Sequence, residues 1–515
     1  MFAFLLWPPA LAGLVFSLFL VLQLLISRQR RVHLPPGPSS GRALRKALKH
    51  NPHELLAEWS KQYCSSVVSV GILWRRVIVV NAFEVADALL NKRSAAFSDR
   101  PNRVAASLCD YHHGMAFMSQ GPRLKQTRGL YQQALNAHVV SLQLPYFERQ
   151  TPSFLVSLLH RPKELHEHIH FFYTKTILDW TLGYRAQSLD DTDLLYLSEK
   201  VSNNSTHMLA ASTQLWVEMF PFFKVLPVWA VGQKTASTIY QFKHELATLF
   251  VRTDEHIRHC LEKGGPSSFM SNILKKKLSD EEKDVAMYSS ASLTAAGFHT
   301  MISITTTFFL AMMKYPEVQR KAQEEIDRIV GRHRLPTAAD QASLPYTEAL
   351  ITEVMRWLPP VALSSRSLKQ DEWYDDMLFP AGCTILTNIW AMTREESWFP
   401  DPHEFRPERY LIPSEDGGMK LDIQKVRHVR HLVFGFGRRV CPGRFFADAL
   451  LWITLSRVLA TMSITSFNDD PVVLPEVLDS VVIRFREFPC NVQERYKGAG
   501  DLVRDAEAEV GDGHA

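Results

Sequence analysis

The stretch FGFGRRVCPG, residues 434–443, sets Cys441 among three glycines and two arginines. Glycines let the backbone turn sharply and approach another group closely. The positive charges of Arg438 and Arg439 would lower the pKa of a nearby thiol and favour the thiolate. Without an adjacent histidine or aspartate base, such a thiolate suits metal ligation better than acyl transfer. A buried, inert structural cysteine is the alternative interpretation.

Two charged motifs upstream of this stretch could support it. ITEVMRW places Glu353 and Arg356 three residues apart on one helix face, where a charge-assisted pair can form. An isolated pair of this spacing usually belongs to a solvated helix face. A third candidate, Arg409, follows in FRPERY, and this context gives the pair its interest.

Residues 289–313 form an apolar stretch without proline or charge, which predicts a buried helix that crosses the core. Ala296 and Thr300 are four residues apart and share one helix face. Gly297 costs roughly 1 kcal/mol relative to alanine in a helix interior, so a reason for its presence is expected. His299 and several serines and threonines lower the hydrophobicity of the stretch, which favours a core helix over a membrane span.

Together these motifs resemble those of the cytochrome P-450 family, in which a cysteine thiolate is the proximal ligand of haem iron. The spacing Phe434-x-x-Gly437-x-Arg439-x-Cys441-x-Gly443 is similar to the family's haem-binding loop. The resemblance implies that Cys441 ligates the iron of haem b (iron protoporphyrin IX) and is no structural cysteine. It also implies haem-binding roles for Phe434, Gly437, Arg439 and Gly443, and structural support of the loop by Glu353, Arg356 and Arg409.

Haem carries two propionates, whose burial must be matched by cations or strong donors. By resemblance, Arg439, Arg366 in ALSSRSL and Arg128 in RLKQTRGLY would bind them. The chain departs from the family four residues before Arg128, where Leu124 stands in place of the usual tryptophan. One indole donor to the propionates is therefore missing.

The segment AAGFHT, residues 295–300, is similar to the family's oxygen-binding helix segment. The resemblance places Ala296 and Gly297 beside the haem and gives Thr300 a catalytic role in proton delivery. His299 replaces the usual acidic residue, and imidazole relays protons near neutral pH because its ordinary pKa is about 6.5. Three interpretations of His299 stay open: a catalytic proton relay, a substrate hydrogen-bond donor, or a core histidine beside a relay of water and Thr300.

The resemblance implies a mainly α-helical fold with a smaller β region, preceded here by one N-terminal transmembrane helix. Residues 1–27 carry no charge and can span the bilayer, and the arginines that follow favour a membrane anchor over a cleaved signal. Residues 28–38 form a basic and proline-rich hinge. Residues 39–495 form one catalytic domain, with a β-hairpin at 67–80. The acidic tail, residues 496–515, is predicted to be disordered.

The composition and charge of the chain limit the class of protein, the kinds of site and the cell compartment that can be expected. Hydrophobic residues make up 46% and charged residues 22% of the chain, as in globular proteins. The six cysteines form no CxxC pair, which indicates neither a zinc site nor a disulfide framework and favours a reducing compartment. A net charge of +4 gives no indication of nucleic-acid binding. The positive-inside rule places the catalytic domain in the cytosol, on a single-pass anchor in the endoplasmic reticulum membrane.

Electrons must come from another protein, because no strand followed by GxGxxG indicates a nicotinamide or flavin domain. We expect NADPH-cytochrome P-450 reductase as the partner, with cytochrome b5 as an optional second donor. An acidic reductase would suit the basic residues that lie close in sequence to Cys441. These are Lys425, Arg427, Arg430, Arg438 and Arg444.

The expected activity is that of a haem-thiolate monooxygenase, which inserts one oxygen atom from O2 into a lipophilic small molecule. Apolar segments at the expected substrate positions favour a terpenoid or another secondary metabolite, and stretches such as KYPEVQRKAQEEIDRIVG resemble mushroom-type microsomal members of the family. The alternatives are a P-450-type isomerase or peroxygenase, and a non-catalytic haem-binding sensor or carrier.

Overall fold

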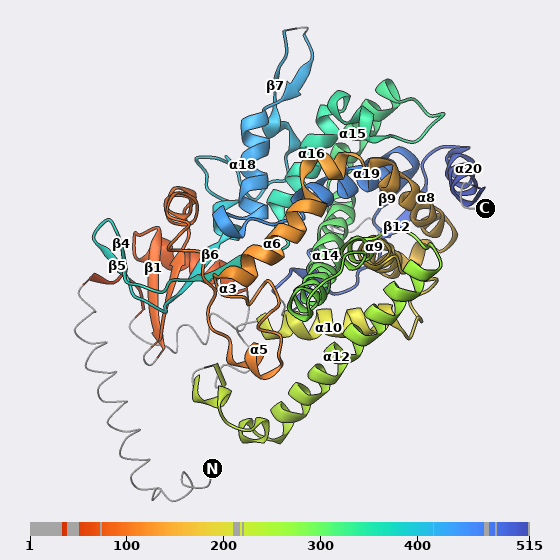
Figure 1. Ribbon diagram of the computed structural model, residues 1–515. Helices are drawn as coiled ribbons and strands as arrows, with labels where there is room; N and C mark the ends of the chain where they lie inside the picture. The colour runs from red at the N-terminus through yellow and green to blue at the C-terminus, as the bar shows by residue number, and fades with distance from the viewer. Residues whose placement is uncertain are drawn as a thin grey trace, which may run out of the picture. The chain divides into compact units, whose positions relative to one another are not determined.

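The computed structural model describes residues 33–38, 51–72, 75–209, 217–218, 221–415, 417–467, 473–478 and 481–512. The predicted anchor, residues 1–27, and the start of the hinge lie outside these ranges. The chain divides into two compact units, each described by itself below (Figure 1). The first comprises Met1–Pro101 and Leu363–Ala391, and the second comprises Asn102–Ala362 and Met392–Ala515. That residues 39–495 act as one catalytic domain stays a prediction.

The first unit contains a mixed four-stranded sheet in the order β1-β2-β6-β3. Strands β1 and β2 pair antiparallel from Val67↔Val80 to Ile72↔Arg75, which confirms the predicted hairpin. Strand β6 lies parallel to β2 and antiparallel to β3. The elements are α3 (Pro52–Gln62), β1 (Val67–Ile72), β2 (Arg75–Val80), α4 (Phe83–Ala86), η2 (Asp87–Lys92), β3 (Leu363–Ser367), β4 (Glu372–Tyr374), β5 (Met377–Phe379) and β6 (Thr384–Asn388).

The described part of the proline-rich hinge, residues 33–38, lies along β1. The backbone N–H of Ser69 donates to the carbonyl of Pro36 at 2.8 Å, and its hydroxyl donates to the carbonyl of Pro35 at 2.5 Å. A Cβ atom added to Gly37 would lie 2.0 Å from the Ser69 carbonyl oxygen. Only glycine permits this close approach, so the segment is fixed to the sheet of its own unit.

The second unit is mainly helical, which confirms the mainly α-helical part of the expected fold class, whereas the expected N-terminal transmembrane helix lies outside the described residues. The long helices are α6 (Pro122–Leu135), α8 (Leu144–His160), α9 (Leu165–Leu182), α10 (Leu194–Leu209), α12 (Gln233–Glu262), α14 (Asp280–Lys314), α15 (Pro316–Ile329), α16 (Pro345–Trp357), α18 (Ile423–Phe434), α19 (Arg444–Thr461) and α20 (Ala499–Asp512). The shorter helical elements are α5 (Val104–Leu108), α7 (Ala137–Ser141), η3 (Pro162–Glu164), η4 (Pro221–Lys224), η5 (Val228–Val231), α13 (Phe269–Leu274), η6 (Ala338–Ser343), η7 (Pro407–Tyr410) and η8 (Gly437–Arg439), while α17 (Ile389–Met392) spans the boundary of the units.

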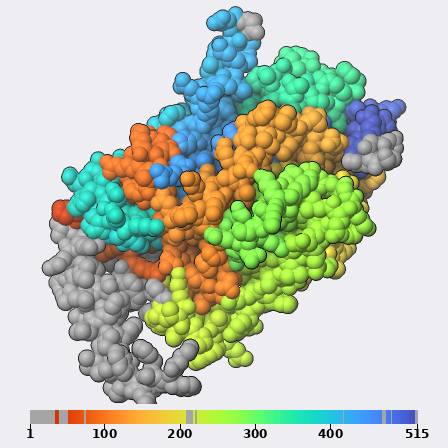
Figure 2. All heavy atoms as spheres, in the orientation of Figure 1, coloured from red at the N-terminus to blue at the C-terminus, as the bar shows by residue number. Residues whose placement is uncertain are grey.

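Short two-stranded ribbons complete the second unit. They are β7 (Leu411–Pro413) with β8 (Met419–Leu421), β9 (Met462–Thr465) with β12 (Asn491–Glu494), and β10 (Val477–Leu478) with β11 (Arg484–Phe485). The β7–β8 ribbon projects from the surface as the blue extension in Figure 2.

Helix α14 is the central element of the second unit and contacts α6, α9, α10, α16 and α19 (Figure 1). It begins with a capping box, in which the Ser279 hydroxyl accepts from the Glu282 N–H and the Glu282 carboxylate accepts from the Ser279 N–H. Among the described residues, it is the one helix long and apolar enough to cross a membrane. Because 78% of its most apolar window is buried, α14 is the predicted core helix.

The predicted disorder of residues 496–515 was wrong, because Ala499–Asp512 form α20, which packs on α8. Ala499 is 1% exposed and Val503 is fully buried, and Val510 is partly buried on the same face. Apolar residues spaced three or four apart give this acidic segment a buried stripe. Asp501, Asp505 and Glu509 are exposed.

Candidate active site

The stretch around Cys441 is a compact loop between two helices. The last residue of α18 is Phe434, whose carbonyl accepts a hydrogen bond from the Cys441 N–H at 2.8 Å. Gly435 and Gly437 have φ values of 82° and 53°, in the left-handed region that favours glycine. Helix α19 begins at Arg444. A Cβ atom added to Gly443 would meet no atom within 4 Å, so open space lies beside the cysteine.

Burial raises the pKa of the Cys441 thiol, and the N–H of Gly443 and the charges of Arg444 and Arg128 oppose that effect. The expected source of the positive charge was wrong. Arg438 is exposed, and Arg439 is buried with its guanidinium donating to the carbonyl of Met118 at 2.6 Å.

This environment fits a metal ligand. A thiol that burial keeps protonated loses its proton when a metal cation coordinates the sulfur. The Gly443 N–H and the two arginines then stabilise the resulting thiolate. The donor set around Cys441 therefore suits a haem iron.

Helix α6 joins the Cys441 loop to α14. The guanidinium of Arg128 donates to the carbonyl of Val440 at 3.2 Å, and the hydroxyl of Tyr131 donates to the carbonyl of Ser289 in α14 at 2.7 Å. Residues three apart lie on one helix face, so the same face of α6 contacts both elements. Leu124, at the departure from the family pattern, is 5% exposed and belongs to the core.

The middle of α14 is open on the face that carries Ala296 and Thr300. Ala296 is exposed and Thr300 partly exposed, whereas Phe298 and His299 are 1% and 4% exposed. The Thr300 hydroxyl donates to the Ala296 carbonyl at 2.9 Å. An exposed residue at the centre of a buried helix indicates a space within the helical unit. His299 is buried, and its three interpretations stay predictions.

The structure explains why glycine occurs at position 297 through a packing contact that the sequence did not predict. A Cβ atom added there would lie 2.9 Å from Cδ1 of Ile177 in α9. Gly297 therefore permits the close packing of α9 on α14. The expected role of Gly297 beside the haem stays a prediction.

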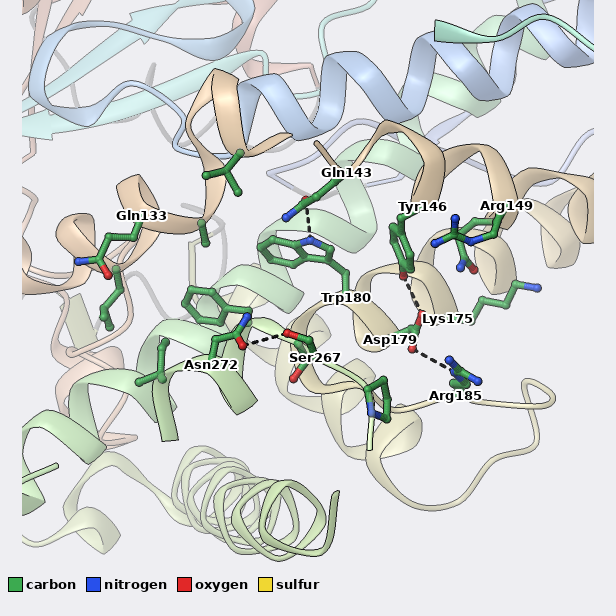
Figure 3. A pocket seen from close by; sticks show the side chains of 18 of the residues that line it. Gln133, Gln143, Tyr146, Arg149, Lys175, Asp179, Trp180, Arg185, Ser267 and Asn272 are labelled. Atoms are coloured by element: carbon green, nitrogen blue, oxygen red, sulfur yellow. Dashed lines mark hydrogen bonds and ion pairs between the residues drawn. The ribbon is translucent and has the colours of Figure 1, made fainter. Parts of the chain in front are cut away.

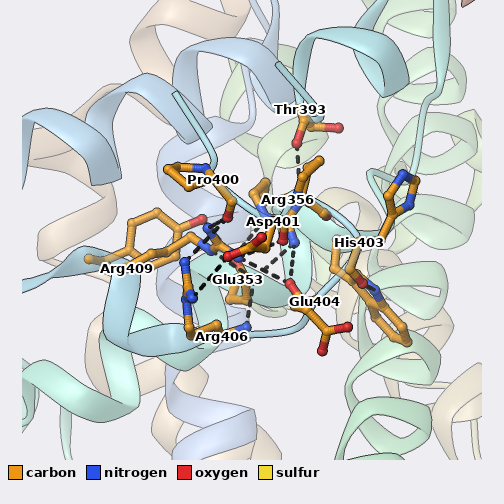
Figure 4. Close-up of polar contacts among 12 residues, drawn as sticks. Glu353, Arg356, Thr393, Pro400, Asp401, His403, Glu404, Arg406 and Arg409 are labelled. Atoms are coloured by element: carbon orange, nitrogen blue, oxygen red, sulfur yellow. Dashed lines mark hydrogen bonds and ion pairs between the residues drawn. The ribbon is translucent and has the colours of Figure 1, made fainter. Parts of the chain in front are cut away.

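Glu353, Arg356 and Arg409 form one buried cluster, as predicted (Figure 4). Glu353 Oε2 lies 2.7 Å from Arg356 Nε, and Glu353 Oε1 lies 3.1 Å from Arg409 Nε. Both Glu353 and Arg356 are fully buried. Two members were missed: the hydroxyl of Tyr410 donates to Glu353 Oε2 at 2.8 Å, and the Arg406 N–H donates to Oε1 at 2.9 Å.

The two arginines of this cluster also bind backbone carbonyls of the segment 400–404. Arg356 donates to Pro402 and Glu404, and Arg409 donates to Pro400, Asp401 and Glu404 (Figure 4). The cluster reaches the Cys441 loop through α18. The N–H of Asp422, the N-cap of α18, donates to the Tyr410 carbonyl at 2.8 Å, and Lys425 donates to the Arg409 carbonyl at 3.2 Å.

Arg366 belongs to the first unit, on β3. It is 3% exposed, and its guanidinium donates to the Ser364 hydroxyl at 3.2 Å and to the Ser365 carbonyl at 3.1 Å. Its predicted role as a propionate ligand stays a prediction.

One cavity of about 1070 Å³ in the second unit is lined by residues of α6, α7, α8, α9, α13 and α20 and by the first turns of α14. Figure 3 shows Trp180 donating to Gln143 and Tyr146 donating to Asp179 at its wall, at 2.9 Å and 2.8 Å. Neither Cys441 nor Thr300 lines it. This cavity is therefore separate from the candidate site.

Two of the basic residues near the loop, Arg427 and Arg438, are exposed. Arg430 is engaged by Glu348 and Asp448, so the expectation that it offers its charge to a partner was wrong.

Comparisons with known proteins identify the family of the chain. The family model described as Cytochrome P450 matches residues 33–484. Cytochrome P450 monooxygenase 176 of Postia placenta is 32% identical over 516 residues, which cover 96% of this chain and 96% of the relative. Cytochrome P450 monooxygenase claR of Ampulloclitocybe clavipes is 31% identical and covers 94% of this chain and 90% of its own length.

A solved zebra fish cytochrome P450, in a structure with abiraterone, superposes with a TM-score of 0.68 at 20% identity. The match covers 86% of this chain and 100% of that chain, and at this identity it shows the fold. The family's cofactor is haem, ligated by a cysteine thiolate. On the family match and its fungal monooxygenase relatives, the chain belongs to the cytochrome P450 family and is a monooxygenase.

Proposed function

We propose that this monooxygenase inserts one oxygen atom from O2 into a lipophilic small molecule, with Cys441 as the ligand of its haem iron. The observation that carries the proposal is the arrangement of α6, α14 and the Cys441 loop. The Cys441 thiol is partly buried and has an N–H donor and two cations close to it, and α14 has exposed Ala296 and partly exposed Thr300 on one face. Helix α6 hydrogen-bonds to both.

When bound, haem supplies the chemistry that activates O2 and transfers an oxygen atom. The chain's part is to hold this group and exclude water. The charges of Arg128 and Arg444 stabilise the Cys441 thiolate. Arg128, Arg366 and Arg439 are the proposed partners of the propionates, because a buried carboxylate needs a cation or strong donor.

Thr300 is the proposed proton carrier. Its hydroxyl proton is donated to the Ala296 carbonyl, so its oxygen can accept a hydrogen bond from water on the open face of α14. A proton can pass through the hydroxyl when the bond to Ala296 is exchanged. His299 stays the alternative relay or substrate donor, and its burial supports a packing role.

We propose a terpenoid or similar apolar secondary metabolite as the substrate. The support comes from the mostly apolar segments at the expected substrate positions, which include the buried Phe298. Shape and burial, with few polar contacts, would then select the substrate. Electrons would come from NADPH through a reductase, which the exposed Arg427 and Arg438 would attract. Residues 1–27 would anchor the chain in the endoplasmic reticulum membrane, with the catalytic domain in the cytosol.

The test is product analysis with the full-length chain in membranes, a eukaryotic NADPH-cytochrome P450 reductase and NADPH. Sesquiterpenes, diterpenes, sterols and aromatic amines are supplied in parallel under ¹⁸O-labelled O2. The expected product carries one labelled oxygen atom and forms only with NADPH and reductase. Product that forms with peroxide and without NADPH would favour the peroxygenase. A rearranged product without label would favour the isomerase.

A further inference from the structure

An ion pair joins the two helices that flank the Cys441 loop. Arg430 lies one turn before the end of α18, and Asp448 lies one turn after the start of α19. Arg430 Nε is 2.7 Å from Asp448 Oδ2. The pair therefore spans the loop from one side to the other, four residues beyond each end (Figure 1 shows the two helices).

The same guanidinium also binds α16. Its NH2 group pairs with Glu348 Oε1, and its NH1 group lies 3.3 Å from the Thr352 hydroxyl. The other carboxylate oxygen of Glu348 accepts from Gln341 at 3.0 Å. Arg430 thus uses all three nitrogens to connect α16, α18 and α19. A planar guanidinium fixes these three directions, which lysine cannot do.

The electrostatics make Arg430 hard to replace. Burial works to lower the pKa of Arg430, but the charges of Asp448 and Glu348 outweigh it and raise the pKa above its ordinary value. The Arg430 guanidinium forms ion pairs with two carboxylates. All three side chains are largely buried, with exposed fractions of 19% for Arg430, 27% for Asp448 and 7% for Glu348. Loss of the cation would leave two acids close together and unmatched.

The Glu353 cluster does not provide this connection. Its contacts with α18 are made at Asp422 and Lys425, at the start of that helix. Arg430 lies at the end of α18 that enters the loop, and Asp448 lies on the far side of the loop. The loop ends are therefore tied together at Arg430.

We propose that Arg430 is a positioning residue for Cys441: by tying α18 to α19 through Asp448, it fixes the separation of the loop ends and so the placement of the thiolate. The inference rests on the proposed function, in which Cys441 is the iron ligand. It predicts that loss of the tie releases the thiolate from iron before it unfolds the protein.

The test uses the full-length haem-loaded protein and four variants. Arg430→Gln removes the tie. Asp448→Asn removes the charge at its α19 end with little change in size, and Glu348→Gln removes the charge that Arg430 meets on α16 while the contact with Thr352 remains. Arg457→Lys is the matched control, a buried arginine of α19 remote from the loop that binds Pro336, Glu148 and Thr151.

Two properties are measured: the carbon monoxide difference spectrum of the reduced protein over time, and the thermal midpoint. We expect Arg430→Gln and Asp448→Asn to speed conversion of the thiolate-type band to the non-thiolate band about tenfold, as loss of one partly buried ion pair implies. Glu348→Gln and Arg457→Lys should lower the thermal midpoint with little change in that rate.

Four outcomes separate the possibilities. If Arg430→Gln or Asp448→Asn lowers only the thermal midpoint, as Arg457→Lys does, the residue is merely structural and the inference fails. If Glu348→Gln speeds conversion as much as Asp448→Asn, the tie to α19 is not the relevant one, and the inference also fails. If Arg430→Gln does not fold, Asp448→Asn alone decides. A wild-type protein without the thiolate-type band would instead refute the assignment of Cys441, which is a separate failure.

Discussion

Arg128 and Tyr131 lie one turn apart on α6 and hydrogen-bond to two different elements, the Cys441 loop and α14. Arg128 donates to the carbonyl of Val440, next to Cys441, and Tyr131 donates to the carbonyl of Ser289 in α14. Since Arg128 also opposes the rise in the pKa of the Cys441 thiol, α6 both positions the loop and tunes its charge.

Arg128→Met should therefore weaken haem binding. The variant loses the hydrogen bond to Val440 and a positive charge near the thiolate, and the size of the side chain is nearly kept. We expect about a tenfold loss of haem affinity, the scale of one charge-assisted hydrogen bond. Competition with apomyoglobin for haem measures this affinity. Lys125→Met, which removes an exposed cation from the same helix, should leave it unchanged.

Cys441→Ser should abolish the thiolate-type carbon monoxide spectrum and the NADPH-dependent activity, because a serine hydroxyl is a far weaker iron ligand than a thiolate. The fold should persist, since the Cys441 N–H still donates to Phe434. Circular dichroism checks the fold. Cys260→Ser, in a partly buried cysteine of α12, is the control and should keep both properties. A thiolate spectrum that survives Cys441→Ser would contradict the proposed ligand.

Glu353→Gln should destabilise the protein by about 3–5 kcal/mol, because it leaves Arg356 and Arg409 buried without their shared carboxylate. The free energy of unfolding from urea titration measures the loss. Glu317→Gln disrupts an exposed pair with Arg320 and should change the stability by less than about 1 kcal/mol. Equal effects of the two substitutions would show that the buried cluster adds no particular stability.

Local spacing was enough to predict the helical pair Glu353–Arg356, and the resemblance added Arg409 and the Cys441 loop. The contacts of Gly297 with Ile177 and of Arg430 with Asp448 were not predicted, because they join helices that are separate in the sequence. The prediction of disorder for the acidic tail was wrong because it gave more weight to the many acidic residues than to the short stripe of apolar residues. Sequence patterns thus indicated which residues matter, while tertiary packing determined what several of them contact.

Gly297→Ala offers a direct test of the packing between α9 and α14. The added methyl group would lie 2.9 Å from Cδ1 of Ile177, and the next atoms of that side chain lie at 3.5 Å and 3.6 Å. Overpacking costs about 1–3 kcal/mol and the preference of a helix interior for alanine over glycine offsets roughly 1 kcal/mol of it, so we expect a small net loss of stability. Ile177→Val removes the clashing Cδ1, so the double variant should recover most of the loss. Absence of recovery would place the cost elsewhere in the helix.

Glu199 of α10 should make stability depend on pH. Burial raises its pKa from 4.5 to about 7, and Glu199 Oε1 lies 3.4 Å from His170 of α9, whose pKa is lowered by burial and by the charge of Arg484. Between pH 4.5 and 7 the unfolded chain ionises at this position while the folded protein keeps the proton. The folded state then binds more protons, so its stability falls as pH rises through this window and levels off above it.

Glu199→Gln removes this ionisation and should flatten the profile in the same window, with the largest gain in stability near neutral pH. Urea unfolding at a series of pH values measures the difference in stability between variant and wild type, which cancels the titrating groups remote from this position. Glu167→Gln, at an exposed position of α9, is the matched control and should leave the profile unchanged. The free energies of unfolding of the wild type and of Glu199→Gln could instead change in parallel from pH 4.5 to 7. The carboxyl of Glu199 would then have the same pKa in the folded and the unfolded chain, which would contradict the effect of burial on that pKa.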